Sequence, residues 1–264
     1  MLTAIDPDMR IILVDNSKGE DNELTNALHT RLMGMVSEVV RCTTTAQVVA
    51  AMENEEHAPV HGICLGGSTL NMSASTVKEC NVRKCTVALL QGKHVPILGV
   101  CFGMHYITTA FGGKVVRLHS PRDSEYEVRA VTYGGTSGRA CFRHQDVVDV
   151  LPLGFEVRAV CAETNVVCEI ASPRMRCLAV QYHPECSSGE CARVLERFVC
   201  EARSSIIEIS PRTRMNDRTF LHIGALMGKR SMLRTAREFA LSKGEVDLCW
   251  RRFRTVFGIP AVMY

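Results

Sequence analysis

Short apolar runs alternate with amphipathic segments through the first 110 residues of the chain. Apolar positions 24, 27, 28 and 32 fall on one side of a helix that is expected over residues 21–33. Residues 45–52 are predicted to form a second helix, which follows a polar run of threonines. Strands are predicted over residues 10–14, 36–41, 61–65 and 96–100. This alternation predicts an α/β domain with a mostly parallel central sheet and helices on both faces.

The second half of the chain departs from this alternation and then returns to it. A helix is expected over residues 104–111, directly after the fourth strand. Residues 115–167 are typical of short strands and turns, which indicates an antiparallel excursion at one edge of the sheet. A further strand is predicted over residues 176–182 and a closing helix over residues 190–200.

The C-terminal segment differs from the rest in charge and pattern. Ser210 marks the expected boundary between a domain of residues 1–209 and a basic helical extension of residues 210–264. From residue 201 onward there are 12 Lys and Arg against 6 Asp and Glu, whereas residues 1–200 have 19 against 22. Two helices are predicted in the extension, over residues 220–241 and 246–257. The second carries an apolar stripe of Trp250, Phe253 and Phe257 beside several arginines.

Three roles for this extension stay open. In the first, the two helices form a hairpin that packs on the chain's own domain. In the second, they form an arm that docks a partner subunit or a second copy of the chain. Aromatic residues and arginines are the side chains that interfaces favour. Nucleic-acid binding comes third, because the excess of positive charge is modest and no recognisable reading motif accompanies it.

The composition is that of an ordinary soluble protein, with 46% apolar and 22% charged residues. No apolar run approaches the ~18 residues that a membrane span needs. The first ten residues lack the basic start and apolar stretch of a secretory signal. We therefore expect a cytoplasmic protein that does not contact a membrane.

Thirteen cysteines are a high count, which would suggest a disulfide framework in a secreted protein, but this chain is long enough to form its own core and lacks an export signal. Most of them are interpreted as small buried apolar residues. Two pairs, Cys80 with Cys85 and Cys186 with Cys191, have a spacing that a metal half-site could use. Both spacings are wider than that of a zinc ribbon, so no metal site is predicted.

One cysteine stands apart because of its position. Cys101 follows the strand over residues 96–100, precedes the next helix, and has Gly99 and Gly103 on either side. Such glycines let a chain turn sharply and hold the central side chain in an exposed, strained position. A helix N-terminus also favours the thiolate form of a cysteine. The alternative is an ordinary turn that contains a buried cysteine.

A candidate base lies far downstream, after the strand over residues 176–182. Pro184 restricts His183 to an extended conformation. Residues two apart in an extended chain project to the same side, so His183 and Glu185 are expected to lie together. The carboxylate would then fix the imidazole tautomer and stabilise its charged form. A surface turn is the usual alternative for such a tripeptide, but its place after a buried strand favours the catalytic interpretation.

Gly66 and Gly67 follow the strand over residues 61–65. Their backbone N–H groups are unobstructed by side chains and suit an oxyanion hole, together with the N–H of Phe102 just after the cysteine. A simple loop with two glycines is the alternative.

Five separated segments resemble one family, the class I (triad-type) glutamine amidotransferases. The segments around Cys101 and His183 resemble the two signatures of that family. Three more resemble the amidotransferase domain of GMP synthases in particular: residues 12–16, 143–146 and 151–157. The resemblance covers residues 10 to about 200 in the family's order.

The resemblance implies a flavodoxin-like three-layer sandwich and a triad of Cys101, His183 and Glu185. It implies that glutamine is hydrolysed through a cysteine thioester, and that ammonia passes to a separate synthetase subunit. No cofactor is implied for this glutaminase half-reaction, and ATP enters only through the partner. Self-association through the extension is the other partner interaction that we expect.

Some positions depart from the family pattern. His105 stands where a substrate-holding glutamine is usual, and Ser68 where proline commonly follows the two glycines. Arg143 replaces the usual serine and, with His144 and Asp146, is a candidate for the face that meets the acceptor. Because of His105, a stand-alone γ-glutamyl peptide hydrolase remains an alternative function. A catalytically idle binding module is a third, which the intact triad disfavours.

Overall fold

The computed structural model describes residues 6–17, 22–53, 59–73, 95–118, 127–133 and 136–204, which belong to a unit spanning Met1–Ile207. The C-terminal extension, with its two expected helices, and the pair Cys80 and Cys85 lie outside the described residues. The strands are β1 Asp6–Val14, β2 Val36–Cys42, β3 Val60–Leu65, β4 Ile97–Val100, β5 Lys114–Arg117, β6 Glu127–Tyr133, β7 Thr136–Phe142, β8 Asp146–Val150, β9 Glu156–Cys161, β10 Val167–Ser172, β11 Cys177–Val180 and β12 His183–Ser188.

The helices are α1 Glu23–Met33, α2 Thr45–Glu53, α5 Phe102–Ala110 and α6 Arg193–Ser204, with short 3-10 helices at Pro173–Met175 and Gly189–Cys191. Helix α1 begins at Glu23 because Asn22 caps it, its side chain accepting bonds from the N–H groups of Leu24 (3.1 Å) and Thr25 (3.4 Å). The closing helix, expected over residues 190–200, is divided into a 3-10 turn and α6.

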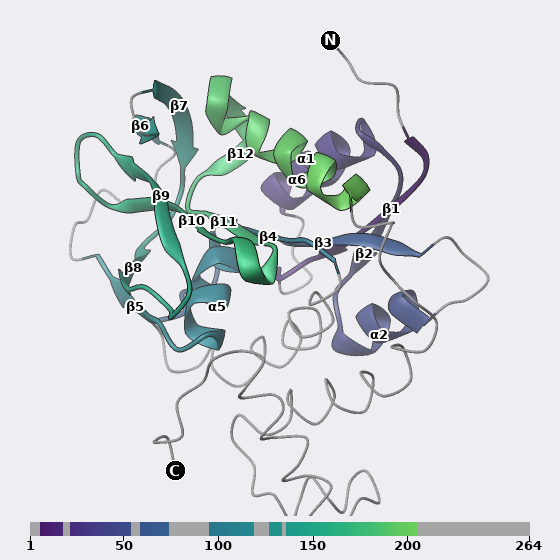
Figure 1. Cartoon of the computed structure of the whole chain (residues 1–264). Coiled ribbons are helices and arrows are strands. Elements are labelled where there is room, and N and C mark those ends of the chain that lie inside the picture. Colours follow the sequence, from purple (N-terminus) through teal and green to yellow (C-terminus); the bar gives the residue numbers. More distant parts are fainter. Residues whose placement is uncertain are drawn as a thin grey trace, which may run out of the picture. The chain divides into compact units, whose positions relative to one another are not determined.

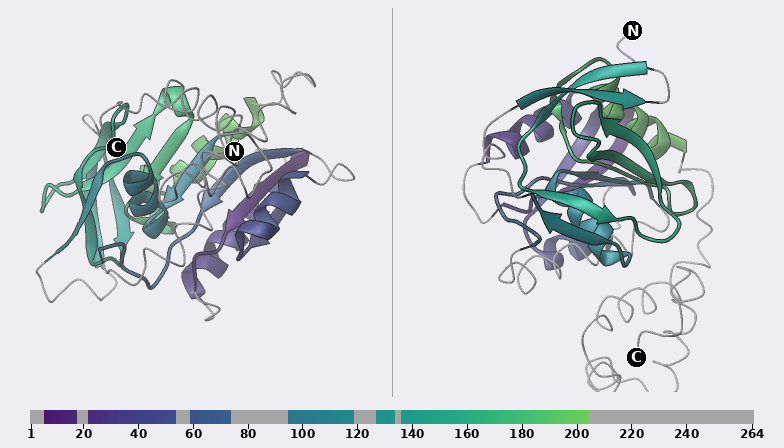
Figure 2. Two further views of the ribbon diagram at one scale, coloured as in Figure 1. Left: turned by 90° about the horizontal axis from the view of Figure 1, so that it is seen from below. Right: turned by 90° about the vertical axis from the view of Figure 1, so that its left-hand side faces the viewer.

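One large mixed sheet organises these elements. Its ten strands run in the order β12-β7-β6-β9-β10-β11-β4-β3-β1-β2. The pairings from β11 to β2 are parallel, and those from β12 to β11 are antiparallel. The predicted α/β class is confirmed, and the antiparallel excursion continues the parallel strands within the same sheet (Figure 2). Strands β5 and β8 form a separate two-stranded sheet.

Helices cover both faces of the parallel strands, as Figure 1 shows. Successive residues of β1 point to opposite sides: Ile11 and Leu13 pack with α1 and α6, whereas Ile12 and Val14 pack with α2 and α5. Every residue of β3 and β4 is buried. This burial explains why these strands are short apolar runs in the sequence rather than alternating ones.

The ten described cysteines are all unpaired thiols, and eight of them are buried. Burial raises the pKa of the Cys42 thiol to about 11 and that of Cys64 still further. For the seven buried cysteines other than Cys101, the interpretation as small buried side chains is confirmed. Cys191 is buried and Cys186 is exposed, and no three His, Cys, Asp or Glu of the described segments are placed to hold a metal ion. In the same segments, no helix combines the length and the apolar character needed to cross a membrane.

Candidate active site

Three neighbouring strands bring together residues from distant parts of the chain. Strands β3, β4 and β11 are adjacent and parallel. Gly67 follows the end of β3, Cys101 the end of β4 and His183 the end of β11. The carboxyl ends of parallel strands meet at one edge of a sheet, which is where open α/β sheets hold their ligands.

The turn at Cys101 has the strained conformation that the sequence predicts. Cys101 has a φ of 52° and a ψ of −104°, in a region that residues other than glycine rarely adopt. Its N–H donates to Val180 O (2.8 Å), which ties the turn to the neighbouring strand. A Cβ atom at Gly103 would lie 2.2 Å from Leu65 O, so only glycine allows the helix to approach β3 this closely.

The thiol of Cys101 lies at the N-terminus of α5. Helix α5 begins at Phe102, two residues earlier than expected, because the turn itself starts the helix. Cys101 is 4% exposed, so its side chain is buried rather than exposed as expected, and its thiol donates a long hydrogen bond to Arg143 O (3.7 Å). The aligned peptide dipoles of a helix favour negative charge at its N-terminus, which suits a thiolate.

His183 and Glu185 lie side by side, as expected from their spacing in an extended chain. They begin β12, and His183 Nδ1 is 2.8 Å from Glu185 Oε1. Both side chains are almost completely buried, at 2% and 1% exposed. Ser187 supports this arrangement, because its hydroxyl donates to His183 O (2.7 Å) and accepts the N–H of Cys141 (3.0 Å).

The surroundings of His183 favour its charged form. Burial opposes the charge, but the carboxylate of Glu185 and the sulfur of Cys101 outweigh it and hold the pKa of His183 well above its usual range. His183 Nε2 is buried and makes no hydrogen bond of ordinary geometry within the described part of the chain, although the sulfur of Cys101 interacts with the ring. An imidazolium with its Nε2–H beside a nucleophile is arranged to give a proton to a leaving group.

Gly67 is the residue of the glycine pair that faces the nucleophile. A Cβ atom at Gly67 would lie 3.3 Å from His183 Cε1 and 3.8 Å from Cys101 Cβ. Gly66 does not have this freedom: its N–H donates to Val14 O (2.9 Å), so its assignment as an oxyanion donor is wrong. The N–H of Phe102 lies in the first turn of α5, where helical N–H groups have no acceptor within the helix. Gly67 and Phe102 therefore remain the candidate donors.

His105 lines the same pocket, but one of its nitrogens is engaged. His105 Nε2 lies 2.7 Å from Gln181 Oε1, and the ring is 3% exposed. Burial lowers the pKa of His105, although the bond to Gln181 opposes this, so the ring is neutral near pH 7. Gln181 is fully buried and was not singled out from the sequence as a site residue.

Arg143, His144 and Asp146, which were expected at the acceptor face, include two residues that line the pocket and one that is buried. Arg143 is exposed and lines the pocket together with His144. Burial, together with the repulsion from His105 when that ring is protonated, lowers the pKa of His144 to about 3. Asp146 is 1% exposed and accepts bonds from Ser73 N–H (2.8 Å) and Ser73 Oγ (2.6 Å). Asp146 thus anchors the loop after β3, and its expected place at the acceptor face stays a prediction.

These groups surround a cavity of about 200 Å³. Its wall contains Cys101, His183 and Gly67, with Phe102 and His105 beside them. Polar residues that the sequence did not distinguish from ordinary loop residues also line it: Asn22, Thr69, Asn71 and Gln145. The volume is below the ~300 Å³ at which drug-sized pockets begin, so the cavity suits a small metabolite.

Comparison with known families agrees with this geometry. Residues 12–202 match the family described as glutamine amidotransferase class-I. The chain belongs to this family. The match contains all three strand ends that form the site and stops before the C-terminal extension.

Two relatives of this class-I amidotransferase are both glutamine-hydrolyzing GMP synthases. The protein of Nitratiruptor sp. is 33% identical over 111 residues, which is 37% of this chain and 21% of the relative. The protein of Sulfurimonas denitrificans is 35% identical over 100 residues, or 34% of this chain and 19% of the relative. The chain thus matches about a fifth of the length of each relative.

A solved structure supports the fold of this class-I amidotransferase. A Thermoplasma acidophilum protein, described as one subunit of a GMP synthase, superposes with a TM-score of 0.58 at 22% identity. The superposition covers 74% of this chain and 94% of that structure. At this identity the likeness establishes the α/β fold.

Proposed function

We propose that this class-I amidotransferase hydrolyses glutamine through a thioester on Cys101 and supplies the ammonia to a synthetase. The observation that carries the proposal is the meeting, in one small pocket, of a strained helix-N-terminal cysteine, a buried His183–Glu185 pair and the backbone of Gly67. A nucleophile, a proton donor oriented by a carboxylate, and an oxyanion donor are what amide cleavage requires.

The first half of the reaction forms the thioester. The thiolate of Cys101 bonds to the side-chain amide carbon of glutamine, and the electron pair of the C=O bond moves to oxygen. The N–H groups of Gly67 and Phe102 stabilise this oxyanion. When the oxyanion collapses, the C–N bond breaks, and His183 Nε2 gives its proton to the leaving nitrogen, which departs as ammonia.

The second half releases glutamate. Neutral His183 accepts a proton from water as the water oxygen bonds to the thioester carbon. The new tetrahedral species expels the sulfur of Cys101. This completes the hydrolysis and restores the thiolate of Cys101 and the imidazolium of His183. Glu185 keeps the ring oriented and favours its charged form throughout.

The molecule that accepts the ammonia would be bound by the partner synthetase. Because the relatives are named as glutamine-hydrolyzing GMP synthases, we propose a GMP-synthase-like synthetase as the partner of this domain. ATP would be consumed there, and the glutaminase half-reaction would use only residues of this chain. Association with that synthetase, or with a second copy of the chain, is the role proposed for residues 210–264.

The test measures glutamate and ammonia released from glutamine by the full chain, alone and with the synthetase that copurifies with it. Cys101→Ala should abolish release while the far-UV circular dichroism spectrum is unchanged. A glutamine-analogue electrophile should label Cys101 alone among the thirteen cysteines. Labelling spread over several cysteines would refute the assignment, and faster hydrolysis of γ-glutamyl dipeptides than of glutamine would assign the chain to peptide hydrolysis instead.

A further inference from the structure

The loop that carries Gly67 is fixed by side chains from outside the catalytic triad. On one side, Gly66 N–H donates to Val14 O and Asn16 Nδ2 donates to Gly66 O, both at 2.9 Å. On the other side, Ser68 Oγ donates to Asn16 O (2.9 Å) and accepts the N–H of Leu70 (3.1 Å). Both neighbours of Gly67 are therefore bonded to the end of β1 or to the loop that follows it.

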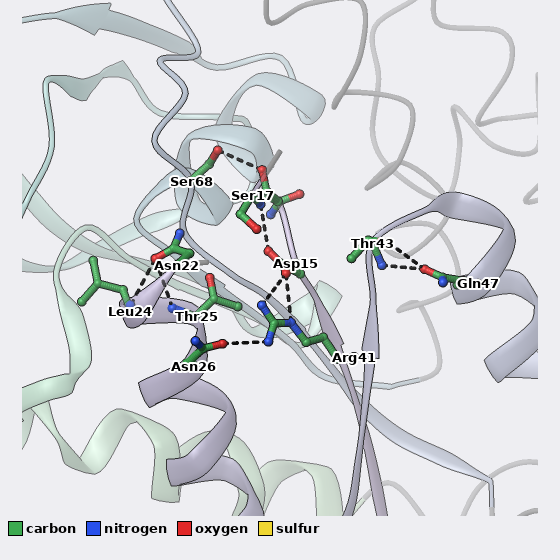
Figure 3. A network of polar contacts seen from close by, with 11 residues as sticks. Asp15, Ser17, Asn22, Leu24, Thr25, Asn26, Arg41, Thr43, Gln47 and Ser68 are labelled. Atoms are coloured by element: carbon green, nitrogen blue, oxygen red, sulfur yellow. Dashed lines mark hydrogen bonds and ion pairs between the residues drawn. The ribbon is translucent and has the colours of Figure 1, made fainter. Parts of the chain in front are cut away.

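The loop after β1 is itself anchored to β2, as Figure 3 shows. Asp15 Oδ1 accepts the N–H of Ser17 (2.8 Å), and Asp15 Oδ2 accepts Arg41 Nε (2.9 Å) and Nη2 (2.7 Å). Arg41 Nη1 continues the chain of bonds to Asn26 Oδ1 (2.8 Å) on α1. Asp15 and Asn16 are 3% and 1% exposed, so water does not compete for most of these bonds.

We propose that Asn16 and Ser68 are positioning residues of the oxyanion hole, which hold the Gly67 N–H toward the oxygen that gains charge beside Cys101. The proposal rests on the proposed glutaminase function. An oxyanion hole works because its donors are aimed before the reaction begins, and removing one donor lowers kcat by about 10²–10³-fold. A misplacement of about 1 Å has an effect of about 10²-fold. A glycine between two unsupported neighbours would have no fixed direction, since it lacks a side chain to restrict it.

The geometry favours positioning over substrate binding for these two residues. Ser68 lines the pocket, but its hydroxyl already donates one hydrogen bond and accepts another. Asn16 is not part of the pocket wall, and its amide is directed to Gly66 O. A group that positions an oxyanion donor acts on the transition state, so its loss lowers kcat and leaves KM nearly constant.

The experiment compares Ser68→Ala with Ser68→Thr in the full chain, using steady-state glutamine hydrolysis. Ser68→Ala should lower kcat by about 10- to 100-fold with KM changed less than about twofold, because the donor is misaimed but not removed. Ser68→Thr keeps the hydroxyl and should restore most of the rate. Asn16→Asp, which loses the amide donor to Gly66 O, should lower kcat in the same way.

Ser17→Ala is the matched control. Ser17 lies in the same loop and donates its backbone N–H to Asp15, a bond that the substitution keeps, while its hydroxyl bonds to none of the described residues. Its kinetic constants should equal those of the wild type.

Alkylation of Cys101 by iodoacetamide provides the second readout, because attack on an sp³ carbon creates no oxyanion. The Ser68→Ala chain should alkylate Cys101 at the wild-type rate while it hydrolyses glutamine slowly. The positioning role would be overturned if Ser68→Ala left kcat unchanged, whether or not KM rose. It would also be overturned if alkylation of Cys101 slowed in parallel with hydrolysis. A wild-type chain that releases no ammonia would instead overturn the proposed function, and this inference with it.

Discussion

Replacing Glu185 with glutamine removes the charge beside His183 and keeps the shape of the side chain. The amide oxygen of the new residue can still accept the Nδ1–H, so the tautomer and the orientation of the ring are retained. What is lost is the attraction between carboxylate and imidazolium over 2.8 Å, in a place where both side chains are almost fully buried. The variant therefore tests the electrostatic role of Glu185 separately from its geometric role.

The size of the effect follows from that contact. A hydrogen bond between charged groups contributes about 1.5–3 kcal/mol. At about 1.36 kcal/mol per unit, the pKa of His183 should fall by roughly 1–2 units in Glu185→Gln. At a pH where the ring of the variant is neutral and that of the wild type is charged, the same energy corresponds to a rate about 10- to 150-fold lower.

The direction of the pH effect is fixed by the raised pKa of wild-type His183. In the proposed mechanism the imidazolium protonates the leaving nitrogen, so activity should be retained below the pKa of His183 and lost as the pH rises through it. In the variant this alkaline loss should begin roughly 1–2 pH units lower, and the difference in rate from the wild type should widen as the pH rises.

The assay is kcat/KM for glutamine from pH 6 to pH 10, with Glu190→Gln as the control. Glu190 is an exposed carboxylate two residues beyond β12 that pairs with Arg193, so its removal should leave the profile unchanged. A Glu185→Gln profile that overlays the wild-type profile in both height and position would show that the carboxylate does not act on His183.

Three further predictions address the pocket, acid stability and the extension. His105→Gln should lower KM for glutamine by about 2- to 10-fold, the contribution of one hydrogen bond, and an unchanged KM for glutamine and γ-glutamyl peptides would show that residue 105 does not touch the ligand. Because burial lowers the folded-state pKa of His144 to about 3, unfolding takes up a proton below pH ~6.5. Stability should therefore fall by about 2 kcal/mol from this group between pH 7 and pH 5, and urea unfolding of His144→Gln should show a smaller loss; equal losses would contradict this. Truncation after Ser210 should strongly lower the melting temperature if the extension packs on its own domain, or leave a stable chain that no longer associates if it docks a partner; a chain that keeps both stability and assembly would refute both roles.

The sequence was informative where local rules determine the structure. Strands β3 and β4 were predictable because they are buried on both faces and leave no room for polar residues. The contact between His183 and Glu185 was predictable because Pro184 enforces an extended chain, in which residues two apart share a side. The turn at Cys101 was predictable because glycines stand two residues before and after the cysteine, and the structure shows that a side chain at Gly103 would meet the carbonyl of Leu65.

Contacts between distant segments were not predictable in this way. Ser73 bonds to Asp146, and Asn71 Nδ2 donates to Gln145 Oε1 (3.0 Å), across more than seventy residues of sequence. Asp146 was expected at the acceptor face, and nothing local indicates that these residues bond to one another. The two members of the glycine pair were also indistinguishable, because the bond that removes Gly66 from the oxyanion hole comes from Val14 on another strand.

Several departures from local rules meet around the pocket of Cys101 and His183. Cys101 has a positive φ, which costs about 1–3 kcal/mol in a residue other than glycine. His183 and Glu185 carry charge in a buried place, and their outer atoms, Nε2 and Oε2, make no hydrogen bond of ordinary geometry among the described residues. Each such atom costs about 1–3 kcal/mol when it is shielded from water. A fold tolerates several such costs side by side when a ligand or a transition state uses them, and the leaving nitrogen of glutamine would satisfy Nε2 at the moment when the proton moves.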